Sequence, residues 1–187
     1  VVVLAGVAVA GFGAGGSDGE GSTAAAPSTP SWGGELRART GVPVQYREAV
    51  TDGAHRCASS LVTPSLLAAI VETASGFDPR AERPERDEVG IALWTPSIFE
   101  RYAVDADGGG ADPRSPTDAL ATLGGYLCAA IPAVERLDGD PGALLAGVYR
   151  NGVTRLEREG GLPAASRPFA RRVVALARAW GRPPGER

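Results

Sequence analysis

The sequence predicts an all-α fold in a single domain of about six helices. From about Val42 onward, apolar residues recur at three- and four-residue steps, which is the spacing of one face of a helix. Four Ser-Pro, Thr-Pro or Asp-Pro pairs mark helix starts, because the first residue caps a helix and proline fits its first turn. No hairpin turn flanked by alternating strands is visible, and neither is a sequence repeat.

The first two helices are expected on either side of a short loop. Residues 43–57 carry apolar side chains at helical spacing, with a proline in the first turn. Thr63-Pro64 opens a second helix that runs to about Ser75 and is apolar enough to be largely buried. Gly76 ends it. The polar segment 78–90 follows, and we expect it to be a solvated loop.

Four more helices are expected in the second half of the domain. Thr95-Pro96, Ser115-Pro116 and Asp140-Pro141 open three of them. The last covers residues 168–180, whose apolar side chains share one face: Phe169, Val173, Leu176, Ala177 and Trp180.

Composition divides the chain into four parts. Residues 1–16 form an uncharged apolar run that is typical of a signal peptide or a membrane anchor. Residues 17–41 are rich in Gly, Ser, Ala and Pro, which indicates a disordered linker before the domain at 42–182 and a short tail at 183–187. We therefore expect export, to the exterior, the cell wall or the outer side of a membrane. Because the sequence contains no Met, we also expect it to continue upstream of Val1.

The charge pattern argues against nucleic acid as a partner. The net charge is -3, and 19 basic and 22 acidic residues are interspersed, without the positive stripe that neutralises phosphates. We predict no cofactor and no metal. Two distant cysteines and a single histidine, His55, are too few ligands for a zinc site. We expect the side chain of His55 to be solvated or partly buried. The loop 105–112 lacks the third Asp and the final Glu of a calcium loop, which favours a glycine-rich turn.

Cys57 and Cys128 are the two cysteines of the chain. In an exported protein an even number of cysteines most simply pairs. The disulfide would close a loop of about 70 residues, worth roughly 4 kcal/mol if the stabilisation comes from unfolded-chain entropy. Two separate buried thiols are the alternative.

Three segments resemble the motifs of one protein family. Residues 66–79, LLAAIVETASGFDP, are similar to a helix whose pattern is apolar residues and then Glu-Ser-x-Phe-x-Pro. Residues 90–96, GIALWTP, resemble Gly-Ile-Ala-Gln-Phe-x-Pro, and residues 148–152, VYRNG, resemble Ala-Tyr-Asn-Ala-Gly. In this order, the motifs resemble those of soluble lytic transglycosylases of the actinobacterial secreted type. The resemblance covers about residues 43–180 and implies a lysozyme-like fold that acts on or binds the glycan strands of bacterial cell-wall peptidoglycan.

The chain departs from the family pattern at three polar positions. Ala74 stands where the family has its catalytic Glu, Leu93 replaces a Gln, and Arg150 replaces an Asn. In the family, that Glu protonates the leaving oxygen and then removes the proton of the muramyl 6-hydroxyl, which gives a 1,6-anhydro sugar. A methyl group can do neither. The resemblance therefore implies a protein that binds peptidoglycan without cleaving it.

Two carboxylates are candidates to replace the missing Glu. Glu72 lies two positions before Ala74, so helical geometry turns it about 200° away. Glu88 lies in the polar segment that we expect to be solvated. The resemblance also implies substrate-binding positions: Ser75, Gly90, Ile91, Leu93, Trp94, Tyr149 and Arg150. The glycine and the aromatic residues among them fit a packing or turn role equally well. Arg150 fits either a contact with a stem-peptide or lactyl carboxylate or a position on the surface.

Two alternatives to non-catalytic binding stay open. One is an active lytic transglycosylase or muramidase that cleaves the MurNAc-GlcNAc bond with another carboxylate. The other is a structural or protein-interaction domain that uses the fold without glycan.

Overall fold

The computed structural model describes residues 33–182. The predictions for residues 1–16, for residues 17–32 of the linker and for the tail lie outside the described residues. Within them, seven α-helices, three short 3-10 helices and one two-stranded sheet make up the fold. The prediction of a helical domain is therefore confirmed, with a small hairpin added to it.

The helices follow one another closely along the chain. They are α1 (Arg47–His55), α2 (Pro64–Ser75), α3 (Pro96–Tyr102), α4 (Pro116–Val134), α5 (Pro141–Asn151), α6 (Val153–Glu159) and α7 (Arg167–Trp180). The 3-10 helices are η1 (Val44–Tyr46), η2 (Pro84–Arg86) and η3 (Ala164–Ser166). All the α-helices except α6 match an expected one.

The predicted helix caps are mostly present. The side chains of Thr63, Ser115 and Asp140 each accept a hydrogen bond from the backbone amide three residues later. Thr95 takes the N-cap position of α3 but makes no such bond. Proline follows each of the four caps in the first helical turn.

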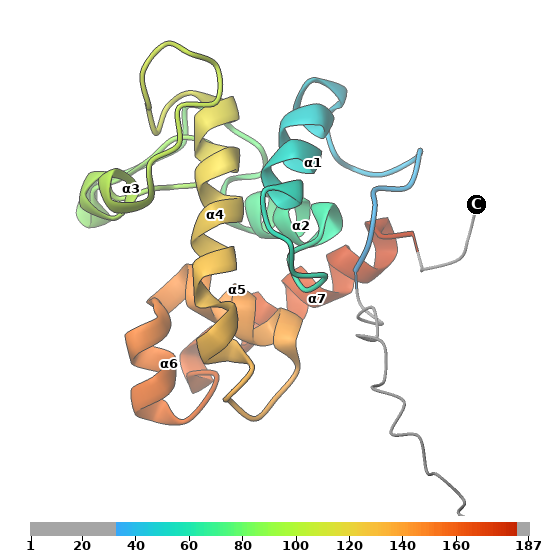
Figure 1. The fold of residues 1–187 in the computed structure, drawn as a ribbon, viewed down its shortest axis with the longest axis vertical. Coiled ribbons are helices and arrows are strands. Elements are labelled where there is room, and N and C mark those ends of the chain that lie inside the picture. The colour runs from blue at the N-terminus through green and yellow to red at the C-terminus, as the bar shows by residue number, and fades with distance from the viewer. Residues whose placement is uncertain (1–32, 183–187) are drawn as a thin grey trace, which may run out of the picture.

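α4 runs through the middle of the fold with α1 beside it, and α7 passes below α2 in this view and contacts both α2 and α5 (Figure 1). α1 and α4 cross so closely that a Cβ added at Gly124 would lie 1.8 Å from the carbonyl oxygen of Gly53, so glycine is required there. The apolar sides of the helices form one core that includes fully buried Leu66, Leu67, Ile70, Ile91, Leu120, Leu123, Leu127, Leu144, Leu145 and Leu156.

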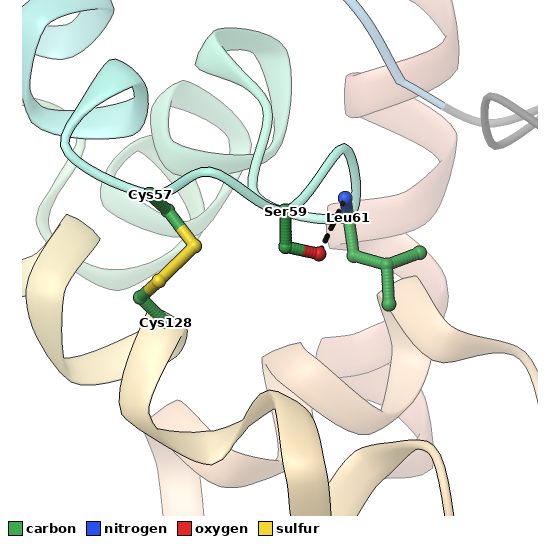
Figure 2. The surroundings of a disulfide bond; sticks show 4 residues. All are labelled: Cys57, Ser59, Leu61 and Cys128. Atoms are coloured by element: carbon green, nitrogen blue, oxygen red, sulfur yellow. Dashed lines mark hydrogen bonds between the residues drawn. A yellow bond between two sulfur atoms is a disulfide. The ribbon is translucent and has the colours of Figure 1, made fainter. Parts of the chain in front are cut away.

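Among residues 33–182, α4 is the one helix long and apolar enough to cross a membrane by length and composition. Most of it is buried inside the fold, as in the central helix of a globular domain. The same helix carries Cys128, whose sulfur is bonded to that of Cys57 just after α1 (Figure 2). The predicted disulfide is thus confirmed, and it joins residues 71 positions apart in the sequence.

Residues 33–41, which composition assigned to the linker, lie against the end of α7. The backbone amide of Arg37 donates to the carbonyl of Trp180 at 2.9 Å, and that of Arg182 donates to Glu35 at 2.7 Å. Leu36 forms an isolated β-bridge with Gly181. These are contacts between backbone groups, which composition does not encode, and they join residues 35–37 to the folded domain.

The segment between α2 and α3 folds as a hairpin, which corrects the expectation of a solvated loop. Strand β1 (Glu82–Arg83) pairs antiparallel with β2 (Glu88–Val89). Two residues are too few to produce a visible alternation of polar and apolar residues. As a result Glu88 is held in a strand, and its side chain is only 15% exposed.

Candidate functional site

Hydrogen bonds connect the three motif segments. At the end of α2, Ser75 Oγ donates to the carbonyl oxygen of Ile91 at 2.5 Å. Near the end of α5, the hydroxyl of Tyr149 donates to the carbonyl oxygen of Ala92 at 2.9 Å. Two helices thereby hold the turn that contains residues 90–93.

The backbone of this turn depends on two left-handed residues. Gly90 has a φ of 77°, and a Cβ there would lie 2.2 Å from the carbonyl oxygen of Pro113. Leu93 has a φ of 45° and donates its amide to Gly90 at 2.9 Å. A left-handed leucine costs on the order of 1 kcal/mol or more, which burial of its side chain offsets.

A pocket of about 190 Å³ lies where the hairpin, the turn, α3 and the end of α5 meet. Five of the predicted site residues line it, namely Glu88, Leu93, Trp94, Tyr149 and Arg150. The other predicted positions, Ser75, Gly90 and Ile91, are not in the lining and act as its support. Sequence reasoning did not select the remaining lining residues Thr95, Ile98, Tyr126, Asn151 and Gly152.

Most of these missed residues had a signal in the sequence. Thr95, Asn151 and Gly152 belong to the motif segments. Ile98 lies two residues beyond one of them, and the structure shows it to be one of two large apolar residues that are strongly exposed among the described residues. Tyr126 had none. It comes from the middle of α4, and its hydroxyl donates to the carbonyl of Val148 at 3.1 Å.

The aromatic residues of the pocket are largely fixed by packing. Trp94 is 4% exposed, donates its indole N–H to the carbonyl of Ala119 at 3.1 Å and meets the ring of Tyr126 edge-on. The ring of Phe169 stacks on Tyr149 and also lies 5.7 Å from the guanidinium carbon of Arg150. Arg150 is exposed, so its charge is available at the rim.

The lining of this pocket offers no free carboxylate in place of Ala74. Ala74 is buried and does not line the pocket, and its carbonyl oxygen accepts a hydrogen bond from Arg83 Nη2 at 2.8 Å. The other amino group of Arg83 lies 3.2 Å from Glu88 Oε2, and Arg86 lies 3.5 Å from Glu88 Oε1. Both oxygens of the one carboxylate in the pocket lining are therefore engaged. Glu72 lies outside this lining.

The two pocket tyrosines stay protonated at neutral pH. Burial is the main cause that raises the pKa of Tyr149, and the negative charge of Glu88 adds to it, against the opposing charges of Arg83 and Arg150. Burial likewise raises the pKa of Tyr126 to about 12. Both hydroxyls therefore act as hydrogen-bond donors to backbone carbonyls.

Three carboxylates that could together hold a metal ion lie away from the pocket, in the loop before α4. Those of Asp105, Asp107 and Asp118 approach within 4.8 Å of one another. Asp118 is fully buried and accepts hydrogen bonds from two backbone amides of the loop. A hydrogen bond from Ser115 lowers the pKa of Asp107. These bonds hold the loop closed on itself. His55, at the end of α1, is exposed and lies 2.7 Å from Glu35.

No protein-family model matches the sequence, and no curated protein shows significant similarity to it. The helical fold and the disulfide are established by the structure. The resemblance to soluble lytic transglycosylases stays a prediction, and so does the function it implies.

Proposed function

We propose that the protein is an exported, lysozyme-like domain of the lytic transglycosylase type that binds the glycan strands of peptidoglycan and does not cleave them. The observation that carries this proposal is the convergence of the three motif segments. They are far apart in the sequence, yet the bonds from Ser75 to Ile91 and from Tyr149 to Ala92 tie them together beside one pocket.

The absence of cleavage follows from the carboxylates near the pocket. A general acid must present a free carboxyl group to the scissile oxygen, and its loss slows such reactions by about 10²- to 10⁴-fold. Ala74 has no ionisable group, and both oxygens of Glu88 are held by arginines. The conditions for acid catalysis are therefore not met in this arrangement.

Binding is supported by the chemistry of the pocket wall. Ile98, which is strongly exposed, offers apolar surface for a sugar ring, and the exposed guanidinium of Arg150 can pair with a lactyl or stem-peptide carboxylate. The pocket volume of about 190 Å³ is below the roughly 300 Å³ at which drug-sized ligand sites begin. We therefore infer that one part of a glycan unit enters it and the strand continues along the surface.

Export is supported by the disulfide, since such bonds persist in oxidising compartments outside the cytoplasm. The apolar run at residues 1–16 points to the same compartment.

Sedimentation with insoluble peptidoglycan sacculi tests the binding proposal. We expect the full chain to pellet with sacculi, and Arg150→Glu to weaken this binding at least about fivefold, because it reverses the charge at the rim. Arg56→Glu is the matched control, since Arg56 is also exposed but lies after α1, outside the pocket lining. Equal binding by the two variants would contradict a role for this pocket.

One observation favours the alternative of an active enzyme. Glu88 lines the pocket and its side chain is 15% exposed, so a carboxylate is present beside the proposed glycan site. This alternative requires Glu88 to leave both arginines during the reaction.

A further inference from the structure

A second and larger pocket lies at the other end of α5, between its first turn and the outer side of α7. Its volume is about 560 Å³, within the range of roughly 300 to 1,000 Å³ that is typical of ligand sites. Aliphatic side chains form its floor, among them Ala143, Leu162 and Val174. Its lining shares no residue with the pocket proposed for glycan.

Three arginines of α7 border this pocket. Arg167, Arg171 and Arg178 are spaced by four and seven residues, which puts them on one side of the helix. All three are exposed, and within residues 33–182 none of their guanidinium groups makes an ion pair or a side-chain hydrogen bond. The stripe spans about 16 Å along the helix axis, from eleven residues at 1.5 Å each.

Little negative charge balances this stripe. Residues 160–182 contain no Asp or Glu, although the chain as a whole has a net charge of -3. The lining holds one carboxylate, that of Asp140, which already accepts the amide of Ala143 at 2.8 Å as the cap of α5. The pocket therefore presents concentrated positive charge above an aliphatic floor.

We propose that this pocket binds an acidic peptide segment, whose carboxylates pair with Arg167, Arg171 and Arg178 and whose aliphatic side chains cover the floor. Guanidinium groups pair with carboxylates through two parallel hydrogen bonds. Three cations spread along about 16 Å match a ligand that carries several anionic groups. A fatty acid, with its single carboxylate, matches them less well.

The shape and composition of the pocket disfavour other anionic partners. No aromatic side chain is in the lining, so a single-stranded nucleic acid would find no surface on which to stack its bases. The inference goes beyond the proposed glycan binding and does not depend on it.

Fluorescence anisotropy with a labelled probe tests the proposal. The probe is an amphipathic peptide of Leu and Ala with Glu at positions spaced by four and seven residues, and its partner peptide has Gln at the same positions. We expect the full chain to bind the Glu peptide, more weakly as salt rises, and the Gln peptide at least about tenfold less tightly.

Arginine variants assign the binding to the pocket. Arg171→Gln with Arg178→Gln should weaken binding of the Glu peptide at least about tenfold. The control variant, Arg158→Gln with Arg172→Gln, removes the same charge from exposed positions outside the lining, and Arg172 lies on the same helix. It should change the affinity for the Glu peptide less than about twofold. All four side chains are exposed, so folding is preserved.

Three results would overturn the proposal. The first is no binding of the Glu peptide, and the second is an equal loss of binding in the two double variants. The third comes from a parallel test with oleate and with phosphatidylglycerol vesicles, and it is binding to one of these but not to the Glu peptide. None of them bears on sedimentation with sacculi, so the failure of this inference is distinct from failure of the glycan proposal.

Discussion

The guanidinium group of Arg83 donates to the backbone carbonyl of Ala74 at 2.8 Å and reaches Glu88 with its other amino group. An arginine from the hairpin thus links Ala74 to the carboxylate in the pocket wall. Under the proposed function, this link affects any attempt to place a general acid at position 74 or at Glu88.

A carboxylate introduced at position 74 should act as a general acid only after a second change. Because Arg83 Nη2 lies 2.8 Å from the backbone carbonyl of residue 74, we expect the carboxylate of Ala74→Glu to pair with Arg83 and not to be free to act as a general acid. We expect Ala74→Glu alone to release no anhydromuropeptides from sacculi, and Ala74→Glu with Arg83→Gln to release a measurable amount. Arg83→Gln alone is the control. Release by the single Glu variant, or none by a folded double variant, would contradict this prediction.

Replacement of Glu88 should affect stability and leave glycan chemistry unchanged. Glu88→Gln removes two ion pairs in a partly buried position, and we expect a loss of about 1 kcal/mol in the free energy of unfolding. Glu82→Gln removes the more exposed pair with Arg114 and should cost less. Urea unfolding measures both. If the wild type released muropeptides and Glu88→Gln did not, the active-enzyme alternative would be correct.

The hydrogen bond from Ser75 to the turn at residues 90–93 should contribute more to the free energy of unfolding than a hydrogen bond within α2 does. Ser75→Ala leaves the carbonyl of the fully buried Ile91 without this donor, which costs about 1 to 3 kcal/mol. In the matched variant Thr73→Ala, the hydroxyl lost bonds only to Ala69 of its own helix, so we expect about 0.5 kcal/mol or less. Similar unfolding midpoints for the two variants would argue against a supporting role for Ser75.

The disulfide should supply a large part of the stability. Because the bond joins positions 71 residues apart, changing Cys57 and Cys128 together to Ala should lower the free energy of unfolding by about 4 kcal/mol. Reduction of the wild-type protein should shift its urea midpoint to that of the double variant. An unchanged midpoint after reduction would exclude this contribution.

Stability should fall at alkaline pH because of two tyrosines. The folded pKa of Tyr126 is about 12 and that of Tyr149 is raised further, whereas an unfolded tyrosine has a pKa near 10. The stabilisation that comes from keeping these two hydroxyls protonated is fully present below about pH 10. It is lost as the pH rises through the folded-state pKa values, at up to about 1.4 kcal/mol per pH unit for each group. The sequence has no lysine, so tyrosines dominate this range. Urea midpoints at pH 9 and 11 measure the effect, and Tyr126→Phe should reduce it. Equal midpoints at both pH values would contradict it.

Most of the helices could be predicted because their signals are local. Thr63 and Asp140 cap helices whose apolar residues recur at helical spacing, and both form the expected bonds. α6 was missed because it has a single buried residue, Leu156, and directly follows α5. The hairpin was missed because each of its strands has two residues, so Glu88 was assigned to a solvated loop.

The candidate site was predictable only where it lies within the motif segments. Leu93, Trp94 and Arg150 were named from those segments and do line the pocket. Tyr126 reaches it from α4, and Arg83 reaches Ala74 from the hairpin. Both contacts depend on how separate elements pack, and no local pattern of residues encodes that.

One measurement tests the central proposal most directly. The full chain is incubated with purified sacculi, the mixture is centrifuged, and protein in the pellet and muropeptides in the supernatant are quantified from the same tube. Binding without cleavage predicts that the protein pellets with the sacculi and that the supernatant contains no 1,6-anhydromuropeptides. Protein that stays in the supernatant would contradict the proposed binding, and release of anhydromuropeptides would contradict the proposal that the domain does not cleave peptidoglycan.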